Sequence, residues 1–233
     1  MHSKQQAQTP LRADARRNRE QIIEAARVLF VQVGPHVPME EIARAAGVGV
    51  GTLYRRFPDR DELVKAVSLD NFTRLVALAR LVERAEPDPA KALTTLLSSA
   101  LEARLGITMT PMTRRAYQAI NDSPEVAEQR AEAIAVARRL LHRSQECGAI
   151  RPDVEIGDTM LALLLVSRLA PHPDDELGGM ALRRMFALVM DGLRTGTGTP
   201  LPGRPVDYHD IEELRARDGL TRFEQPGEPE QAP

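Results

Sequence analysis

One stretch of the sequence, EEIARAAGVGVGTLYRRFPDRDEL over residues 40–63, restricts the fold more than any other. Its first part places apolar residues at i, i+3 and i+4, the spacing of one face of a helix. Gly47 ends that helix, because glycine accepts the positive φ of a helix C-terminus. A second helix starts at Val50 and stops before Pro58, which disfavours helical geometry at the residue preceding it. Two short helices joined by a turn with glycine predict a helix-turn-helix.

The second of these helices has two faces of different chemistry. Leu53 and Phe57 lie four residues apart, so they share one face, which we expect to be buried against neighbouring helices. The opposite face and its flanks carry small or hydrogen-bonding groups that suit a major groove and its phosphates. We therefore predict DNA contacts from Val50, Gly51, Thr52, Tyr54 and Arg55. A generic helical hairpin is the alternative.

The segment AGVGVGTLYRRFPDRDEL resembles the helix-turn-helix of the TetR family of bacterial transcriptional repressors, whose pattern runs roughly AGVS-x-GTLY-x-HF-x-x-K-x-x-L. The resemblance runs from the first helix to the start of the fourth, and the remaining two thirds of the chain carries no motif that we can match. It implies a homodimer in which an inducer binds the larger helical domain and the fourth helix moves two DNA-binding heads. Arg60 stands where the family usually has a lysine, which implies a phosphate contact.

Two positions depart from the family pattern. Pro38 stands where the family more often has threonine, and Gly49 replaces the usual serine before the recognition helix. Glycine is an acceptable N-cap, so we expect the fold to survive both changes. Two hydroxyl contacts to DNA are lost, and we expect Arg55, Tyr54 and the helix ends to carry the binding instead.

Charge is concentrated at the N-terminal end of the chain. Residues 1–60 hold 10 Lys and Arg against 6 Asp and Glu, a balance of +4. Because the net charge of the whole chain is −2, the remaining residues carry a balance of −6. A basic end on an acidic body is what localised nucleic-acid contact requires. Four arginines precede the apolar stripe of a helix expected over residues 15–33, so they can lie along a phosphate backbone: Arg12, Arg16, Arg17 and Arg19. A solvated helix start is the alternative.

Composition favours an all-α fold. The chain is 42% hydrophobic but only 3% aromatic, with no tryptophan, so its core must be mostly Leu, Ala, Val and Ile, which suits helices. No run of about 18 apolar residues and no secretory signal is present, so we expect no membrane partner and a cytoplasmic protein.

We expect about nine helices in an N-terminal three-helix bundle with a helix-turn-helix and a larger C-terminal helical domain. The expected divisions are a disordered basic arm over 1–14, a DNA-binding domain over 15–62, a ligand-binding and dimerisation domain over 63–196, and a flexible acidic tail over 197–233.

A helix expected over residues 157–170 is apolar nearly all round, which indicates burial on two sides. Its own domain and a partner subunit would satisfy both sides. Together with the helix expected over residues 175–193, it would make a four-helix interface between two subunits, in agreement with the resemblance. The residues expected at this interface are Met160, Leu163, Leu164, Ser167, Met185, Phe186 and Val189.

The small-molecule site is less constrained. The resemblance places an inducer pocket between the middle helices, where methionine adapts to varied shapes and arginine can meet an acidic ligand. The residues expected to line it are Phe72, Arg104, Met109, Met112, Tyr117 and Arg168. Each is at least as compatible with an ordinary core or surface position.

Nothing in the sequence indicates catalysis, a metal or a cofactor. The five histidines show no i+3 or i+4 spacing, and Cys147 lies at a helix C-terminus, which raises rather than lowers a thiol pKa. We therefore predict a non-enzymatic, ligand-responsive repressor that binds a palindromic operator as a homodimer. The alternative is an all-α small-molecule-binding protein whose helix-turn-helix no longer reads DNA. The sequence does not identify the operator, the regulated genes, the inducer, the sign of regulation or the role of the tail.

Overall fold

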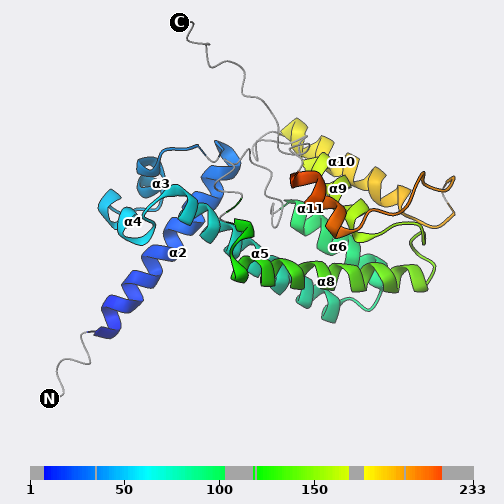
Figure 1. The fold of residues 1–233 in the computed structure, drawn as a ribbon, viewed down its shortest axis with the longest axis horizontal. Helices are drawn as coiled ribbons and strands as arrows, with labels where there is room; N and C mark the ends of the chain where they lie inside the picture. The colour runs from blue at the N-terminus through cyan, green and yellow to red at the C-terminus, as the bar shows by residue number, and fades with distance from the viewer. Residues whose placement is uncertain are drawn as a thin grey trace, which may run out of the picture.

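The computed structural model describes residues 8–34, 36–102, 118, 120–167, 176–196 and 198–216. This part of the chain contains nine helices and no β-strand, which confirms the expected all-α class. A small N-terminal head lies at one end of the molecule and a larger helical body at the other (Figure 1). The helices are α2 (Gln8–Gln32), α3 (Met39–Ala45), α4 (Val50–Arg56), α5 (Arg60–Ala85), α6 (Pro89–Glu102), α8 (Pro124–Glu146), α9 (Ile156–Ser167), α10 (Glu176–Gly192) and α11 (Tyr208–Ala216).

The head consists of α2, α3 and α4 packed around the first turns of α5. Its core contains one fully buried aliphatic side chain from each of the four helices: Ile22, Ile42, Leu53 and Leu63. Because Leu53 and Phe57 are both buried, the apolar face assigned to the second helix of the motif is confirmed. The burial of these side chains fixes the orientation of α4 within the head.

Local signals set the helix ends. Gly47 has φ of +67° just after α3, and Gly148 has φ of +73° just after α8, as expected for glycines that end helices. Asp59 begins α5 by accepting a hydrogen bond from the Glu62 N–H at 2.9 Å. Ser123 begins α8 with Pro124 at the first helical position.

The body is built on α5 and α8, which run alongside one another (Figure 1). Its core is aliphatic, and Leu93, Leu140 and Leu141 are fully buried there. Arg139 of α8 donates two hydrogen bonds of 3.1 Å to the carboxylate of Glu83 on α5, and this hydrogen bonding holds the pKa of Glu83 below its usual value. Arg80 and Glu132 form a similar pair at 3.1 Å, so ion pairs line the exposed edge of this packing.

Both ends of the chain differ from expectation. The helix expected to start at residue 15 begins at Gln8, so residues 8–14 are helical where a disordered arm was expected. Residues 198–216, which were expected to be part of a flexible tail, pack against the body and include α11, with Ile211 buried. Part of the all-round apolar character of α9 is explained by this tail, which covers one of its flanks.

None of the helices in the described part of the chain combines the length and the hydropathy required to cross a membrane. The apolar helix α9 extends over only 12 of these residues, and the body and the tail pack against it.

The body core gives a direct stability test. Leu140→Ala removes a side chain that is 0% exposed, and we expect the free energy of unfolding to fall by about 2–5 kcal/mol. Leu81→Ala is the matched control, because Leu81 is 58% exposed, and we expect a change within about 0.5 kcal/mol. Urea denaturation followed by circular dichroism measures both, and equal losses would contradict the assigned core.

Candidate DNA-binding surface

Helix α4 presents a continuous exposed surface opposite its buried anchor. Leu53 is 0% exposed, whereas Val50, Gly51, Tyr54 and Arg55 are exposed and Thr52 is partly exposed. Gly51 carries no side chain, and a Cβ built there would meet only the flexible end of Arg55. The structure therefore brings five of the predicted DNA-contacting residues together on one short helix.

Polar contacts organise this surface. The Arg55 guanidinium donates a 2.8 Å hydrogen bond to the hydroxyl of Thr52, one turn earlier on α4. The Tyr54 hydroxyl donates a long, 3.5 Å hydrogen bond to the Glu40 carboxylate on α3. Both contacts are exposed, and a weak hydrogen bond is readily exchanged for one to a DNA oxygen. The helix begins at Gly49 without a side-chain cap, as its sequence predicts.

The arginines of α2 extend this surface beyond α4. Arg19 lies over the ring of Phe57, with its guanidinium carbon 5.4 Å from the ring centroid. This cation–π contact ties α2 to the end of α4. Arg16 lies one turn before Arg19 on the same side of α2, so it continues the surface.

Two of these arginines have acidic neighbours on their own helix. Arg16 is 3.6 Å from Glu20 and Arg17 is 3.9 Å from Asp14, and all four side chains are largely exposed. Surface pairs of this kind contribute about 0–1 kcal/mol. The pairs are therefore weak enough for a phosphate to displace the carboxylates.

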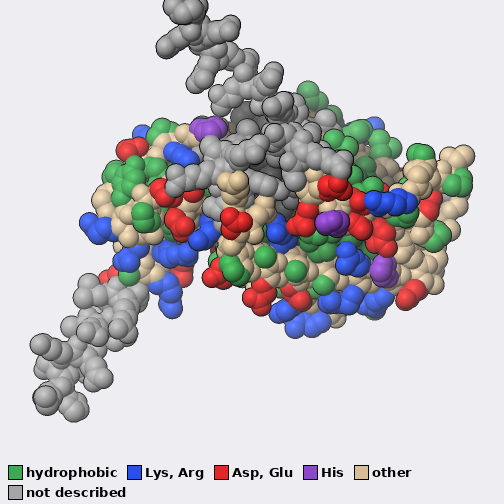
Figure 2. Space-filling view, in the orientation of Figure 1, with side chains coloured by type: hydrophobic (Ala, Val, Ile, Leu, Met, Phe, Trp, Pro, Cys, Tyr) green, Lys and Arg blue, Asp and Glu red, His purple; other side chains and the backbone are tan. Residues whose placement is uncertain are grey.

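Three further arginines of the head are exposed. Figure 2 shows Lys and Arg side chains along the lower edge of the head. Arg19, Arg44 and Arg56 are exposed on α2, α3 and α4, and of these only Arg19 was predicted to lie along a phosphate backbone. Arg60, which was predicted, is partly exposed at the first position of α5. The sequence signal that could have found Arg44 and Arg56 is their place in the last turns of α3 and α4.

The residues predicted for the ligand pocket are mostly not described. Phe72 is buried in the core that joins the head to α5. The other five lie outside the described residues: Arg104, Met109, Met112, Tyr117 and Arg168.

The residues predicted for the dimer interface differ in how far they are already buried within the protomer. Four are already buried within the protomer: Leu163, Leu164, Ser167 and Phe186. Met160 and Val189 are partly buried, and Met185 is at the exposed margin. The exposed large apolar side chains on α9 and α10 are instead those of Leu165, Leu177, Met180, Met185 and Leu188.

The described residues offer no cluster of metal ligands. Across the described residues, no three or more His, Cys, Asp or Glu side chains gather in a way that could hold a metal ion.

Comparison with known proteins agrees with this geometry. Residues 22–67 match the family of bacterial regulatory proteins called tetR, and these residues include the whole helix-turn-helix. Residues 88–195 match the C-terminal domain of SbtR-like transcriptional regulators. A TetR transcription regulatory protein from Mycobacterium vanbaalenii is 32% identical, with a TM-score of 0.52 over 80% of this chain and 100% of that one.

The chain belongs to the TetR family of bacterial transcriptional regulators. A second TetR regulator of known structure, from Streptomyces coelicolor, is 30% identical, with a TM-score of 0.56 over 77% of this chain and 99% of that one. An HTH-type transcriptional regulator of Staphylococcus aureus is 44% identical over 54 residues, which are 23% of this chain and 29% of that protein. The match to the staphylococcal protein thus spans less than a third of its length.

The cap of α5 makes the position of the TetR head testable. Asp59→Ala removes the acceptor for the Glu62 N–H, and we expect the free energy that stabilises the first turn of α5 to fall by about 1 kcal/mol. Asp59→Asn is the control, because asparagine caps helices as well as aspartate does. Hydrogen exchange of the first turns of α5 measures the effect. Equal protection in wild type and Asp59→Ala would show that the cap does not hold this end.

Proposed function

We propose that this TetR regulator is a ligand-responsive repressor, which binds a palindromic operator as a homodimer in the bacterial cytoplasm and is released by a small molecule. The observation that carries the proposal is that α4 has one buried face and one exposed face with hydrogen-bonding groups. Leu53 anchors one face in the head, and the opposite face offers Thr52, Tyr54 and Arg55 to an external partner. A short helix held at a fixed angle, with hydrogen-bonding groups outward, suits insertion into a major groove.

The proposed contacts with the operator are of two kinds, those with base edges and those with phosphates. In this proposal Arg55 contacts a base edge, and guanine is its best partner because a guanidinium can bond both O6 and N7. Tyr54 would exchange its long hydrogen bond to Glu40 for a phosphate oxygen. Arg16, Arg17 and Arg60 would contact phosphates, with Val50 and Gly51 allowing close approach of α4 to the groove floor.

Dimerisation would place two such heads on one operator. Leu177, Met180 and Leu188 lie along one side of α10, and each is exposed in the protomer. A second copy would cover this side of α10 together with Leu165 of α9. Two-fold symmetry then predicts half-sites about 10 base pairs apart, or a small multiple of that spacing.

Ligand control would act on the spacing of the two heads. Helix α5 enters the core of the head and the core of the body, so a ligand that shifts α5 in the body also shifts the head. Release from DNA requires a coupling free energy of about 1–3 kcal/mol between the two sites.

Selection of bound duplexes from a random pool tests the proposal as a whole. Recovery of a two-fold symmetric sequence by the full-length protein supports a repressor of the proposed type, and candidate ligands can then be screened for release of that duplex. Recovery of no preferred sequence would favour a ligand-binding protein that does not read DNA.

Recognition by α4 can be tested at single positions. We expect Arg55→Ala and Tyr54→Ala each to weaken binding to the selected duplex by about 1–3 kcal/mol, because each removes a direct contact. Arg84→Ala is the control, since Arg84 is an exposed arginine in the last turn of α5, far from the head. Fluorescence anisotropy measures affinity, and sedimentation confirms that the variants keep the wild-type assembly. Unchanged affinity for both variants would refute the assignment.

The proposed dimer surface has its own test. Leu188→Glu places a charge at a side chain that is 60% exposed in the protomer, so the monomer should fold normally. We expect the dissociation constant of the dimer to rise at least 100-fold, because a buried, unpaired carboxylate costs several kcal/mol. Leu81→Glu is the matched control, at a residue 58% exposed on α5. Analytical ultracentrifugation measures both, and an equal effect of the two changes would contradict this interface.

A further inference from the structure

The C-terminal segment after α10 is packed where a flexible tail was expected. We call residues 198–216 the C-terminal clasp; they comprise an extended stretch followed by α11. The clasp begins beyond residue 195, where the match to the SbtR-like C-terminal domain ends. It is therefore an addition to the matched family domain, and its contacts have to be explained from this chain alone.

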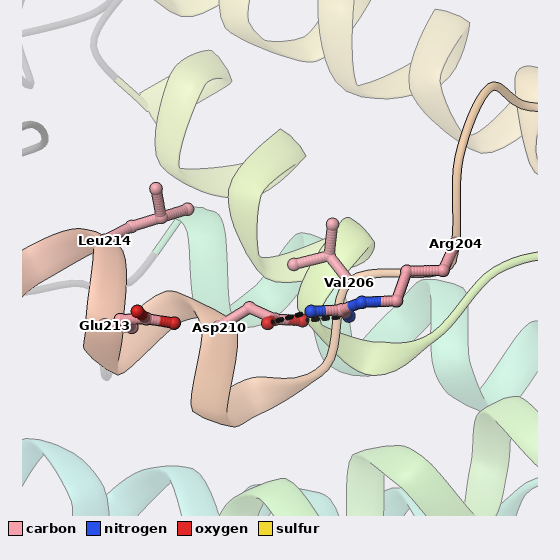
Figure 3. A pocket seen from close by; sticks show the side chains of 5 residues that line it. All are labelled: Arg204, Val206, Asp210, Glu213 and Leu214. Atoms are coloured by element: carbon pink, nitrogen blue, oxygen red, sulfur yellow. Dashed lines mark hydrogen bonds and ion pairs between the residues drawn. The ribbon is translucent and has the colours of Figure 1, made fainter.

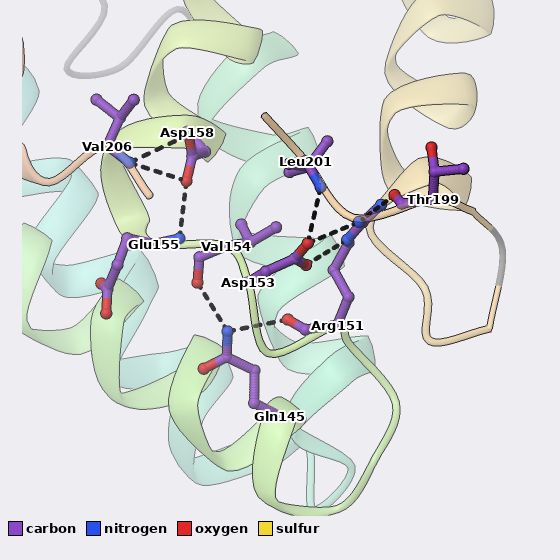
Figure 4. A network of polar contacts seen from close by, with 9 residues as sticks. All are labelled: Gln145, Arg151, Asp153, Val154, Glu155, Asp158, Thr199, Leu201 and Val206. Atoms are coloured by element: carbon purple, nitrogen blue, oxygen red, sulfur yellow. Dashed lines mark hydrogen bonds and ion pairs between the residues drawn. The ribbon is translucent and has the colours of Figure 1, made fainter. Parts of the chain in front are cut away.

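The extended stretch of the clasp is held by two carboxylates of the α8–α9 loop and α9 (Figure 4). Asp153 accepts a 3.0 Å hydrogen bond from the Leu201 N–H, and Arg151 donates a 2.8 Å hydrogen bond to the Thr199 carbonyl. Asp158 of α9 accepts the Val206 N–H at 3.2 Å and 3.3 Å. These contacts satisfy backbone groups of the clasp at three points along its length.

One of these carboxylates, Asp158, also holds the start of α9, and the other belongs to the same polar network. Asp158 accepts a 2.9 Å hydrogen bond from the Glu155 N–H, which closes the first turn of α9. Asp153 is bonded by the Arg151 guanidinium, and this bond holds the pKa of Asp153 well below its usual range. Gln145 of α8 donates hydrogen bonds to the carbonyls of Arg151 and Val154. One polar network thus joins α8, the loop, α9 and the clasp.

Backbone packing at Gly157 shows how closely the clasp approaches α9. A Cβ at Gly157 would lie well inside van der Waals distance of the carbonyl oxygens of both Val206 and Asp207. Both atoms belong to the backbone, so no side-chain rotation can relieve the clash. Only glycine at this position of α9 allows the clasp to lie as it does.

The helical part of the clasp is anchored by burial and charge. Ile211 is 1% exposed, and Tyr208 packs at the edge of the body core. The Glu212 carboxylate lies 3.7 Å from the guanidinium of Arg130 on α8, and the Arg130 side chain is mostly buried. Burial of Ile211 opposes detachment of the clasp independently of the polar network.

We propose that the C-terminal clasp holds α9 and the α8–α9 loop in their present orientation, and that this hold is required for a second copy to dock on α9 and α10. The second half rests on the homodimer proposed above. Asp158 carries the coupling, because it bonds the clasp and the first turn of α9 at once. Loss of the clasp would free the first turns of α9, and the exposed Leu165 farther along that helix would lose its fixed position.

A role for the clasp as a small-molecule site is less favoured. Arg204, Val206, Asp210, Glu213 and Leu214 line a depression of about 190 Å³ on its outer side (Figure 3). Typical ligand pockets enclose about 300–1,000 Å³. The charged groups in it already bond one another, since Arg204 donates a 2.5 Å hydrogen bond to the Asp210 carboxylate.

Gly157→Ala in the full-length protein tests the clasp, with Gly192→Ala as the matched control. Both are glycine-to-alanine changes in helices, but a Cβ at Gly192 meets nothing within 4 Å. By hydrogen exchange, we expect Gly157→Ala to speed exchange at least tenfold in residues 198–216 and 156–162, with α4 as an unaffected reference. Gly192→Ala should leave both regions unchanged. Ile211→Ser weakens the other end of the clasp and should speed exchange in the same two regions. This second variant decides the question if Gly157→Ala fails to fold.

The outcomes separate the two halves of the proposal. Unchanged exchange of α9 when the clasp exchanges faster would overturn the hold on α9. The dimer dissociation constant, measured by sedimentation, should rise at least tenfold in Gly157→Ala, and an unchanged value would overturn the link to docking. A wild-type protein that is monomeric at every concentration would refute the proposed dimer, and the exchange result would still decide whether the clasp holds α9.

Discussion

The structure depends on one helix that is shared by two hydrophobic cores. Leu63 and Val67 of α5 belong to the core of the head, whereas Ala79 and Val82 belong to the core of the body. A helix of 26 residues is about 39 Å long, and its hydrogen bonds make it stiff over that distance. The head cannot turn on the body without disturbing the packing of one end of α5. This shared burial makes a small helix-turn-helix mechanically part of a larger molecule.

Those features of the fold that local chemistry controls could be predicted from the sequence. Gly47, Asp59 and the Ser123–Pro124 pair mark helix ends through backbone conformation and capping, and the structure confirms each of them. The packed tail could not be predicted in this way. Its composition is that of a linker, and its order comes from contacts with Asp153 and Asp158, 48 residues earlier in the chain. Periodicity and composition carry no information about partners so distant in sequence.

The DNA-binding surface was predictable to a similar degree. Helical angles separate Leu53 from Arg55, and the structure confirms that one is buried and the other exposed. The contact of Arg19 with the ring of Phe57 could not be predicted, because Phe57 follows the end of α4, 38 residues later in the chain. For the dimer surface, apolar character alone could not distinguish side chains such as Phe186, which fill the protomer core, from those such as Leu188, which remain exposed. Only the packing of α10 against the body makes that distinction.

The clasp and α5 solve the same physical problem at opposite sides of the body. A regulator that transmits a small displacement needs stiff elements, since loose packing would absorb the movement before it reached the DNA. Helix α5 obtains its stiffness from length and from burial at both ends. Helix α9 is short and begins after a loop, and Ile156 and Thr159 bury its first turn against the body. Asp158, Gly157 and the clasp supply an external hold at that point. A chain without such an extension would have to fix the start of α9 by other contacts, which is why the clasp is best understood together with the docking surface that α9 and α10 present.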